Sequence, residues 1–278
     1  MTAVLSALIA ALGYGVSDFV GGIASRRVAA LRVVVVSYPV ALVLLVLAAI
    51  PMGGQLSTAA VAWGALAGLV QAFGVWWFYA ALGSGPISVV SPLTAVLVAG
   101  IPVLAGVALG ERPSVVAGVG VVLALVAVVL VSRGATDEDS RPHRFTAKVA
   151  WLTVGSGVAF GMNFVILHQI PPEAKLWPLV LGRLVAAAVV LFAALVTANL
   201  VFERGVPLRL AVLAGVLDNV ATLLALQSSM LSLAGVLIAL YPAATVVLAI
   251  VVLRERVTRW QALGMVLALG SVVMIAAN

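Results

Sequence analysis

Long apolar runs alternate with short polar joints along the whole chain. Most runs approach the roughly 20 residues that a helix needs to cross a bilayer. We interpret as spans residues 3–23, 33–50, 58–82, 86–109, 114–132, 149–169, 176–198, 208–229, 232–253 and 259–277. The joints hold clustered Gly, Pro and Ser or a few charges, and most are too short to fold on their own. The pattern predicts an all-α integral membrane protein with ten transmembrane helices.

The sequence also repeats itself at an offset of 144 residues. Rare residue types keep register under this shift: Gly13 with Gly157, Ser88 with Ser232, and Glu111-Arg112 with Glu255-Arg256. Because the chain holds nine acidic residues in total, a matched Glu-Arg pair indicates duplication more strongly than matched Ala, Val or Leu. We predict a first five-helix repeat in residues 1–134, a polar linker in 135–147 and a second five-helix repeat in 148–278.

An odd number of helices per repeat has a geometric consequence. The second repeat must enter the membrane from the face opposite to the first, so the repeats are inverted. Inverted repeats are typical of secondary transporters, whose sites lie near the midplane where the halves meet. The alternative is a duplicated membrane anchor without transport. We favour transport, because two related halves provide the two conformations that alternating access requires.

Composition narrows the class of protein further. Hydrophobic residues make up 64% and charged residues 9% of the chain, and the mean hydropathy is +1.28. A soluble domain carries about 25% charged residues. The chain lacks cysteine and has two histidines, so we expect no metal site and no cofactor. It has neither a nucleotide-binding loop nor a nucleophile with its base, so we predict no enzyme activity.

The basic residues carry topological information. The net charge of +6 lies in short connections between apolar runs and does not indicate nucleic-acid binding. Odd-numbered connections hold twelve Lys and Arg residues, whereas even-numbered ones hold Arg112 and Lys175. With the basic face in the cytoplasm, this bias predicts a multi-pass protein of the cell (inner) membrane with both termini outside.

Three sequence features support a resemblance to a known family. They are the duplicated five-span unit, the run VALGERP at 107–113 with its partner VVLRERV at 251–257, and the string GYGVSDF at 13–19. In these features the chain resembles the ten-span EamA-type transporters of the drug/metabolite transporter superfamily. The resemblance covers essentially the whole chain and implies transport of a small molecule. It also implies both termini in the cytoplasm, opposite to the orientation that the charge count predicts.

Three charged residues lie well inside the predicted spans: Asp18, Arg183 and Asp218. A charge in the bilayer centre costs at least ~2.5–3.5 kcal/mol, so such residues face the protein interior and are candidates for function. Arg183 and Asp218 lie on neighbouring antiparallel spans at depths that differ by roughly 7 Å. They form either a structural ion pair or a contact to substrate, and Arg183 is suited to hold a carboxylate.

Asp18 differs because its own span holds no basic residue at comparable depth. Tyr14 and Ser17 share its helix face. An aspartate without a counter-ion in a low dielectric takes up a proton readily, and it can exchange that proton for an amine. The resemblance adds that the related small multidrug resistance proteins use a first-span acid in this way. The alternative is a structural role, in which Asp18 contacts Arg26 or Arg27 or bonds exposed backbone near the neighbouring glycines.

The remaining candidates are neutral polar or aromatic residues inside the spans. As further substrate-binding residues we predict Trp77, Asn163, Asn219 and Tyr241. By contrast, Glu111 and Glu255 lie at span ends beside arginines and indicate helix-end ion pairs.

Together these features predict a secondary transporter, an exporter or exchanger of a small amine-bearing metabolite such as an amino acid or organic cation. It works by alternating access with proton coupling. The alternatives are an electroneutral exchanger of an anionic or zwitterionic metabolite held by Arg183, and a non-transport anchor. The expected partners are the substrate and membrane lipid, without nucleic acid, and the expected state is a monomer or homodimer.

Overall fold

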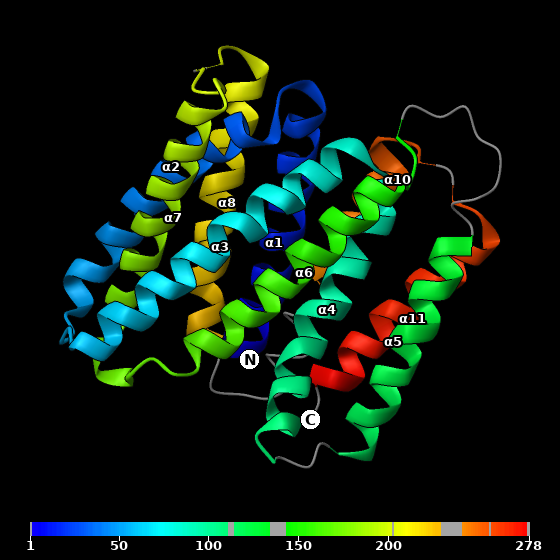
Figure 1. Cartoon of the computed structure of the whole chain (residues 1–278), viewed down its shortest axis with the longest axis horizontal. Helices are drawn as coiled ribbons and strands as arrows, with labels where there is room; N and C mark the ends of the chain where they lie inside the picture. The colour runs from blue at the N-terminus through cyan, green and yellow to red at the C-terminus, as the bar shows by residue number, and fades with distance from the viewer. Residues whose placement is uncertain are drawn as a thin grey trace.

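The computed structural model describes residues 2–110, 114–133, 143–201, 203–228, 241–255 and 257–276, and these residues form helices and loops without a strand (Figure 1). The first repeat contains α1 (Thr2–Arg27), α2 (Ala30–Met52), α3 (Thr58–Ser84), α4 (Ile87–Ala108) and α5 (Val115–Arg133). The second contains α6 (Ala147–Leu167), the short 3-10 helix η1 (Pro172–Ala174), α7 (Trp177–Val196), α8 (Val206–Ser228), α10 (Tyr241–Val252) and α11 (Arg259–Ala276).

The predicted fold class is confirmed, and nine of the predicted spans coincide with α1 to α8 and α11 to within a few residues. Seven helices are long and apolar enough to cross a membrane, and the apolar parts of α5, α10 and α11 are shorter. The first part of the predicted span 232–253, residues 232–240, lies outside the described residues, and so do Glu111, Arg112 and most of the predicted linker.

Local sequence signals explain where several helices begin and end. The hydroxyl of Ser57 accepts a hydrogen bond from the Ala60 amide at 3.1 Å, and it caps α3. The hydroxyl of Thr146 caps α6 in the same way. Helix α2 ends at Met52, and Gly53 follows it with a φ of 63°, which few other residues adopt at low cost. These polar joints separate helices that would otherwise continue as one apolar run.

The two repeats interlock through equivalent contacts. Helix α1 packs mainly against α8 and α10 of the second repeat, while its counterpart α6 packs against α3 and α4 of the first. Helix α2 lies against α7, and α5 lies against α11. The start of α1 and the end of α11 lie at the same end of the bundle (Figure 1). This arrangement is the one expected of inverted repeats, and it places α1 on the boundary between the halves.

Small residues allow the helices of different repeats to approach closely. A Cβ atom on Gly64 would meet the Pro178 carbonyl oxygen at 2.7 Å, and one on Gly68 would collide with the backbone of Gly182. The interior is accordingly rich in alanine, whereas large apolar side chains such as Leu47 and Phe192 point outward. A bundle with an apolar outer surface is suited to lipid, where close van der Waals contact holds helices together.

Candidate functional site

The polar face of α1 meets the second repeat near the middle of the bundle. The Tyr14 hydroxyl donates to Thr222 Oγ1 of α8 at 3.1 Å, and the Ser17 hydroxyl donates to the Ala214 carbonyl oxygen at 2.9 Å. Within the described part of the chain, the Asp18 carboxylate has no hydrogen bond and no ion pair. Tyr14 and Ser17 therefore form hydrogen bonds to α8, whereas Asp18 on the same face does not.

The expected alternative for Asp18, a contact with Arg26 or Arg27, is absent among the described residues. Arg26 pairs with Glu255 instead, at 2.6 Å. Arg27 is exposed at the end of α1. Asp18 lies within electrostatic range of Asp218, an acid and not a cation. Its charge has no counter-ion from the described chain.

Arg183 of α7 and Asp218 of α8 form an ion pair, which is one of the two alternatives expected from their similar depths in the membrane. One guanidinium nitrogen of Arg183 lies 2.8 Å from Asp218 Oδ2. The guanidinium also lies over the ring of Tyr38, 4.9 Å from its centroid, which adds a cation–π contact. The side chain of Arg183 is 10% exposed and that of Asp218 is 32% exposed. Asp218 therefore keeps free surface inside the bundle that the arginine does not cover.

All four tyrosines of the chain gather around these charged groups. Tyr14 and Tyr241 meet edge to face, with ring centroids 6.1 Å apart. Tyr79 and Tyr241 lie within electrostatic range of Asp18, and Tyr38 stacks on Arg183. We use the name central site for this set: Tyr14, Ser17, Asp18, Tyr38, Tyr79, Arg183, Asp218 and Tyr241.

The central site lies deep in the bundle. We define the basic end as the end that carries the α1–α2, α3–α4 and α7–α8 connections. At 1.5 Å per residue, Asp18, Asp218 and Arg183 lie about 14, 18 and 20 Å from it. These depths are close to the middle of a core of ~30 Å. The site is thus at the level where inverted-repeat transporters bind their substrates.

Asn219 follows Asp218 on α8 and is 1% exposed. Neither its amide nitrogen nor its amide oxygen has a hydrogen-bond partner in the described structure. Buried polar groups of proteins are nearly always paired, so an unpaired amide marks a place where water or a ligand binds. Asn219 remains a candidate for this reason.

Two of the predicted lining residues lie elsewhere. Asn163 of α6 donates to the Ala67 carbonyl oxygen of α3 at 2.8 Å and so connects two helices. Trp77 lines an apolar groove of about 770 Å³ on the outer side of α3 and α6, with Trp63 and Trp151. The structure therefore does not bring Asn163 or Trp77 into the central site.

Sequence reasoning missed Tyr38, and it considered Tyr79 as a cavity wall but chose Trp77 as the substrate-binding residue of that span. A usable signal existed, because tyrosine occurs four times in a chain rich in Ala, Val and Leu. A buried tyrosine needs a partner for its hydroxyl, and that of Tyr38 donates to the Gln71 carbonyl oxygen at 3.1 Å. Rare polar aromatics inside apolar spans were therefore as informative as the charges.

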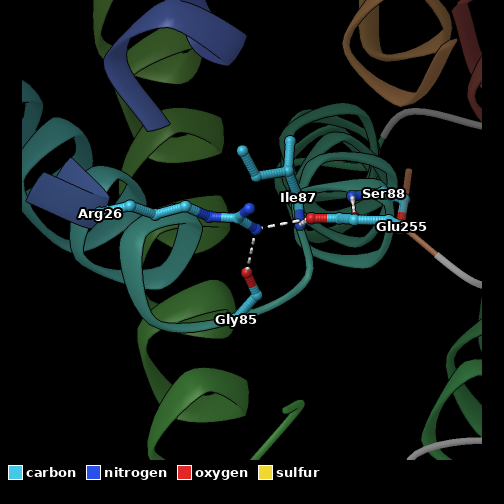
Figure 2. A network of polar contacts seen from close by, with 5 residues as sticks. All are labelled: Arg26, Gly85, Ile87, Ser88 and Glu255. Carbon is cyan, nitrogen blue, oxygen red and sulfur yellow. Dashed lines mark hydrogen bonds and ion pairs between the residues drawn. The ribbon is translucent and has the colours of Figure 1, made fainter. Parts of the chain in front are cut away.

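A second polar cluster lies at the basic end (Figure 2). The Glu255 carboxylate, which follows α10, accepts hydrogen bonds from the Ile87 and Ser88 amides at the start of α4, and from the Ser88 hydroxyl at 2.7 Å. Arg26, at the end of α1, donates to Glu255 and to the Gly85 carbonyl oxygen. We define the basic-end network as Arg26, Gly85, Glu255 and the first turn of α4, which includes Ser88.

Other charged groups surround the basic-end network. Desolvation and the charge of Arg26 lower the pKa of His143, and the Glu255 carboxylate partly offsets this effect. A second ion pair between the repeats joins Arg32 of α2 to Glu203 in the α7–α8 connection at 2.6 Å. Both described ion pairs of this end therefore connect a first-repeat arginine to a second-repeat glutamate.

Comparison with known proteins agrees with this architecture. One solved structure, described only as a crystal structure of a protein, is 15% identical in sequence and has a TM-score of 0.65. The match covers 98% of this chain and 95% of that chain, and it concerns the fold alone. No curated protein sequence matches closely enough to suggest a substrate. The model of the EamA-like transporter family matches residues 1–133 and again residues 147–277. The chain thus belongs to the EamA-like transporter family, whose members are small-molecule transporters of the membrane.

Proposed function

We propose that this protein is a secondary transporter of a small amine-bearing metabolite, such as an amino acid or an organic cation. The observation that carries the proposal is the Asp18 carboxylate, which lies near mid-depth without a counter-ion among the described residues. A lone charge in this position is costly and is retained where function requires it. An ammonium group is the ligand that would neutralise it.

The tyrosines around Asp18 suit the same class of ligand. The face of an aromatic ring attracts a cation, and the attraction grows when water is excluded. Tyr14 of α1, Tyr79 of α3 and Tyr241 of α10 lie within electrostatic range of Asp18, so both repeats supply an aromatic ring near it. We propose that Asp18 binds either a proton or the substrate ammonium. Movement of the substrate in one direction is then coupled to movement of a proton in the other.

The interlocked repeats support transport by alternating access. Helix α1 contacts the second repeat more than it contacts α2, its neighbour in sequence. A rocking motion between the repeats would therefore expose Asp18 to one membrane face at a time. We propose export or exchange in the cell membrane, with the basic end in the cytoplasm, both termini outside and no enzyme activity.

A second candidate is a zwitterionic or anionic substrate held by Arg183. The observation in its favour is the 32% exposure of the Asp218 side chain, which leaves one side of the ion pair open. A substrate carboxylate could then replace Asp218 as the partner of Arg183. The existing ion pair and the stacking on Tyr38 weigh against it, because both must weaken before Arg183 accepts a new anion.

Thermal unfolding of the purified protein tests the proposal. We would screen amino acids, organic cations, nucleosides and sugar phosphates at acidic and alkaline pH, for wild type and for Asp18→Asn. Protons compete with the ammonium for the carboxylate, so we expect amines to raise the wild-type Tm more at alkaline pH. The variant should show no such pH dependence. Equal stabilisation of both proteins at both pH values would reject the role of Asp18, and stabilisation by anions alone would favour Arg183.

A further inference from the structure

The basic-end network connects the two repeats between Asp18 and the basic membrane face, where the proposed transport pathway would leave the protein. Arg26 lies on the same helix as Asp18 and about 12 Å nearer the basic end. Its partner Glu255 belongs to the second repeat, while the start of α4 belongs to the first. The side chains of Arg26 and Glu255 are 14% and 12% exposed.

The chemistry of the network makes it stable while it is formed. The Glu255 carboxylate accepts two backbone amide hydrogen bonds at the positive end of the α4 dipole, together with the Ser88 hydroxyl. Arg26 supplies the neutralising charge at 2.6 Å. If the repeats separate here, Glu255 loses its charge partner, its helix end, or both. Breaking such a partly buried pair is costly, because each charge must find water.

The inverted repeat offers a comparison between the two ends. Under the 144-residue offset, Glu255 corresponds to Glu111 and Ser88 to Ser232, but Arg26 corresponds to Ile170. Arg32, which pairs with Glu203 at the basic end, corresponds to Leu176. The two arginines that join the repeats at the basic end thus have apolar counterparts.

From this asymmetry we infer that the basic-end network is a gate, which holds the basic end of the transport pathway closed in the substrate-free protein. The inference rests on the alternating access proposed above. The gate opens when the Arg26–Glu255 pair breaks. The described residues of the opposite end form no ion pair between the repeats, so that end separates at lower cost. The central site of the resting protein therefore faces the end that carries the chain termini.

The chain lacks cysteine, so a single introduced thiol can report on the gate. Ser25 precedes Arg26, and its hydroxyl is buried without a hydrogen-bond partner in the described structure. Ser25→Cys therefore replaces an unpaired hydroxyl with a thiol of similar size. We would measure the rate at which a water-soluble maleimide labels this thiol in the purified, substrate-free protein.

We expect slow labelling in the Ser25→Cys background and labelling at least about fivefold faster when Arg26→Gln is added, because loss of the charge pair favours opening. Arg26→Lys should retain slow labelling. The matched control is Arg27→Gln, which removes an exposed arginine from the same helix end and should leave the rate unchanged. Glu255→Gln is the second variant and should also accelerate labelling.

Equal rates in all these variants would overturn the gate, as would equal acceleration by Arg27→Gln. If Arg26→Gln or Glu255→Gln lowers the Tm below the labelling temperature, the other of these two variants provides the test. The proposed function has a separate readout. If it is correct, an amine that raises the Tm changes the labelling rate of Ser25→Cys itself. If no ligand does so while Arg26→Gln still accelerates labelling, the gate stands and the assignment of substrate fails.

Discussion

At the scale of single residues, the three charges inside the bundle have two different environments. Arg183 and Asp218 neutralise each other at 2.8 Å, whereas Asp18 has no counter-ion among the described residues. An ion pair without net charge can have a purely structural role. An unpaired acid near mid-depth costs free energy and does not stabilise the fold in exchange. We therefore propose that Asp18 binds the substrate ammonium and that the Arg183–Asp218 pair has a supporting role.

This division predicts how neutral variants of the pair behave. Arg183→Gln leaves Asp218 without its counter-ion and should lower the free energy of unfolding by about 1–3 kcal/mol, less than for a fully buried pair. Adding Asp218→Asn should recover most of this loss. Thermal unfolding with and without a stabilising amine measures both effects. If the folded double variant no longer responds to amines, the pair contacts the substrate and our division is wrong.

The sequence allowed some of these residues to be identified and not others. Depth along a helix follows from counting, so the contact between Arg183 and Asp218 could be predicted. Which way a side chain points depends on the rotation of each helix against its neighbours. Trp77 and Tyr79 are two residues, or about 200°, apart on α3, and only Tyr79 faces the central site. Counting alone could not tell which of the two would do so.

At the scale of the helices, glycines on α1 make room for the central site. A Cβ atom on Gly15 would meet the Tyr241 carbonyl oxygen at 2.6 Å. The Thr245 hydroxyl of α10 donates to the Gly15 carbonyl oxygen at 3.0 Å across the same contact. A Cβ atom on Gly21 would overlap the ring of Tyr79. Glycine at these two positions thus lets α10 and α3 bring their tyrosines to Asp18.

We predict that Gly21→Ala displaces Tyr79, lowers the Tm and weakens the response to amines. The matched control is Gly100→Ala on α4, where a Cβ atom would meet nothing within 4 Å. That change should leave the Tm unchanged or raise it, because alanine favours a helix by up to ~1 kcal/mol over glycine. Thermal unfolding and amine binding compare the two variants. Identical behaviour would show that Gly21 has no special place in the site.

Helix positions were predictable because each apolar run is bounded by polar or glycine-rich joints. Predicted and observed ends of α4 differ by one residue, at 86–109 against Ile87–Ala108. The start of α2 differs by more, because the prediction began after Arg32 whereas the helix begins at Ala30 and includes that arginine. Arg32 can lie in the first turn of α2 because Glu203 neutralises it. That partner lies in the other repeat, so local sequence could not reveal it.

At the scale of the whole molecule, the duplication predicted the architecture and the charges predict the orientation. The inverted repeats follow from an odd number of helices per copy, and the packing of α1 and α6 on opposite repeats agrees with them. The orientation is still a prediction, and it opposes the one that the resemblance implied. Of the twelve basic residues on which the predicted orientation rests, Arg26 and Arg32 are held in ion pairs.

Cysteine labelling of intact cells measures the orientation directly. Gln55→Cys places a thiol in the exposed α2–α3 connection, and Val201→Cys places one in the α7–α8 connection at the basic end. With the basic end in the cytoplasm, a membrane-impermeant maleimide should label the first variant in intact cells. It should label the second only after permeabilisation. The reverse pattern would place both termini in the cytoplasm and reject the charge-based orientation.

The coupling of a proton to an amine through Asp18 is the central claim, and proton movement in liposomes tests it most directly. We would reconstitute wild type and Asp18→Asn with a pH-sensitive dye inside. The added ligand would be the best-stabilising amino acid or quaternary ammonium ion of the thermal screen, because neither crosses lipid as a neutral base. Exchange of the incoming cation for an outgoing proton should make the wild-type interior alkaline, and the variant should show no change. An equal pH change in both proteins, or none in wild type, would contradict the account.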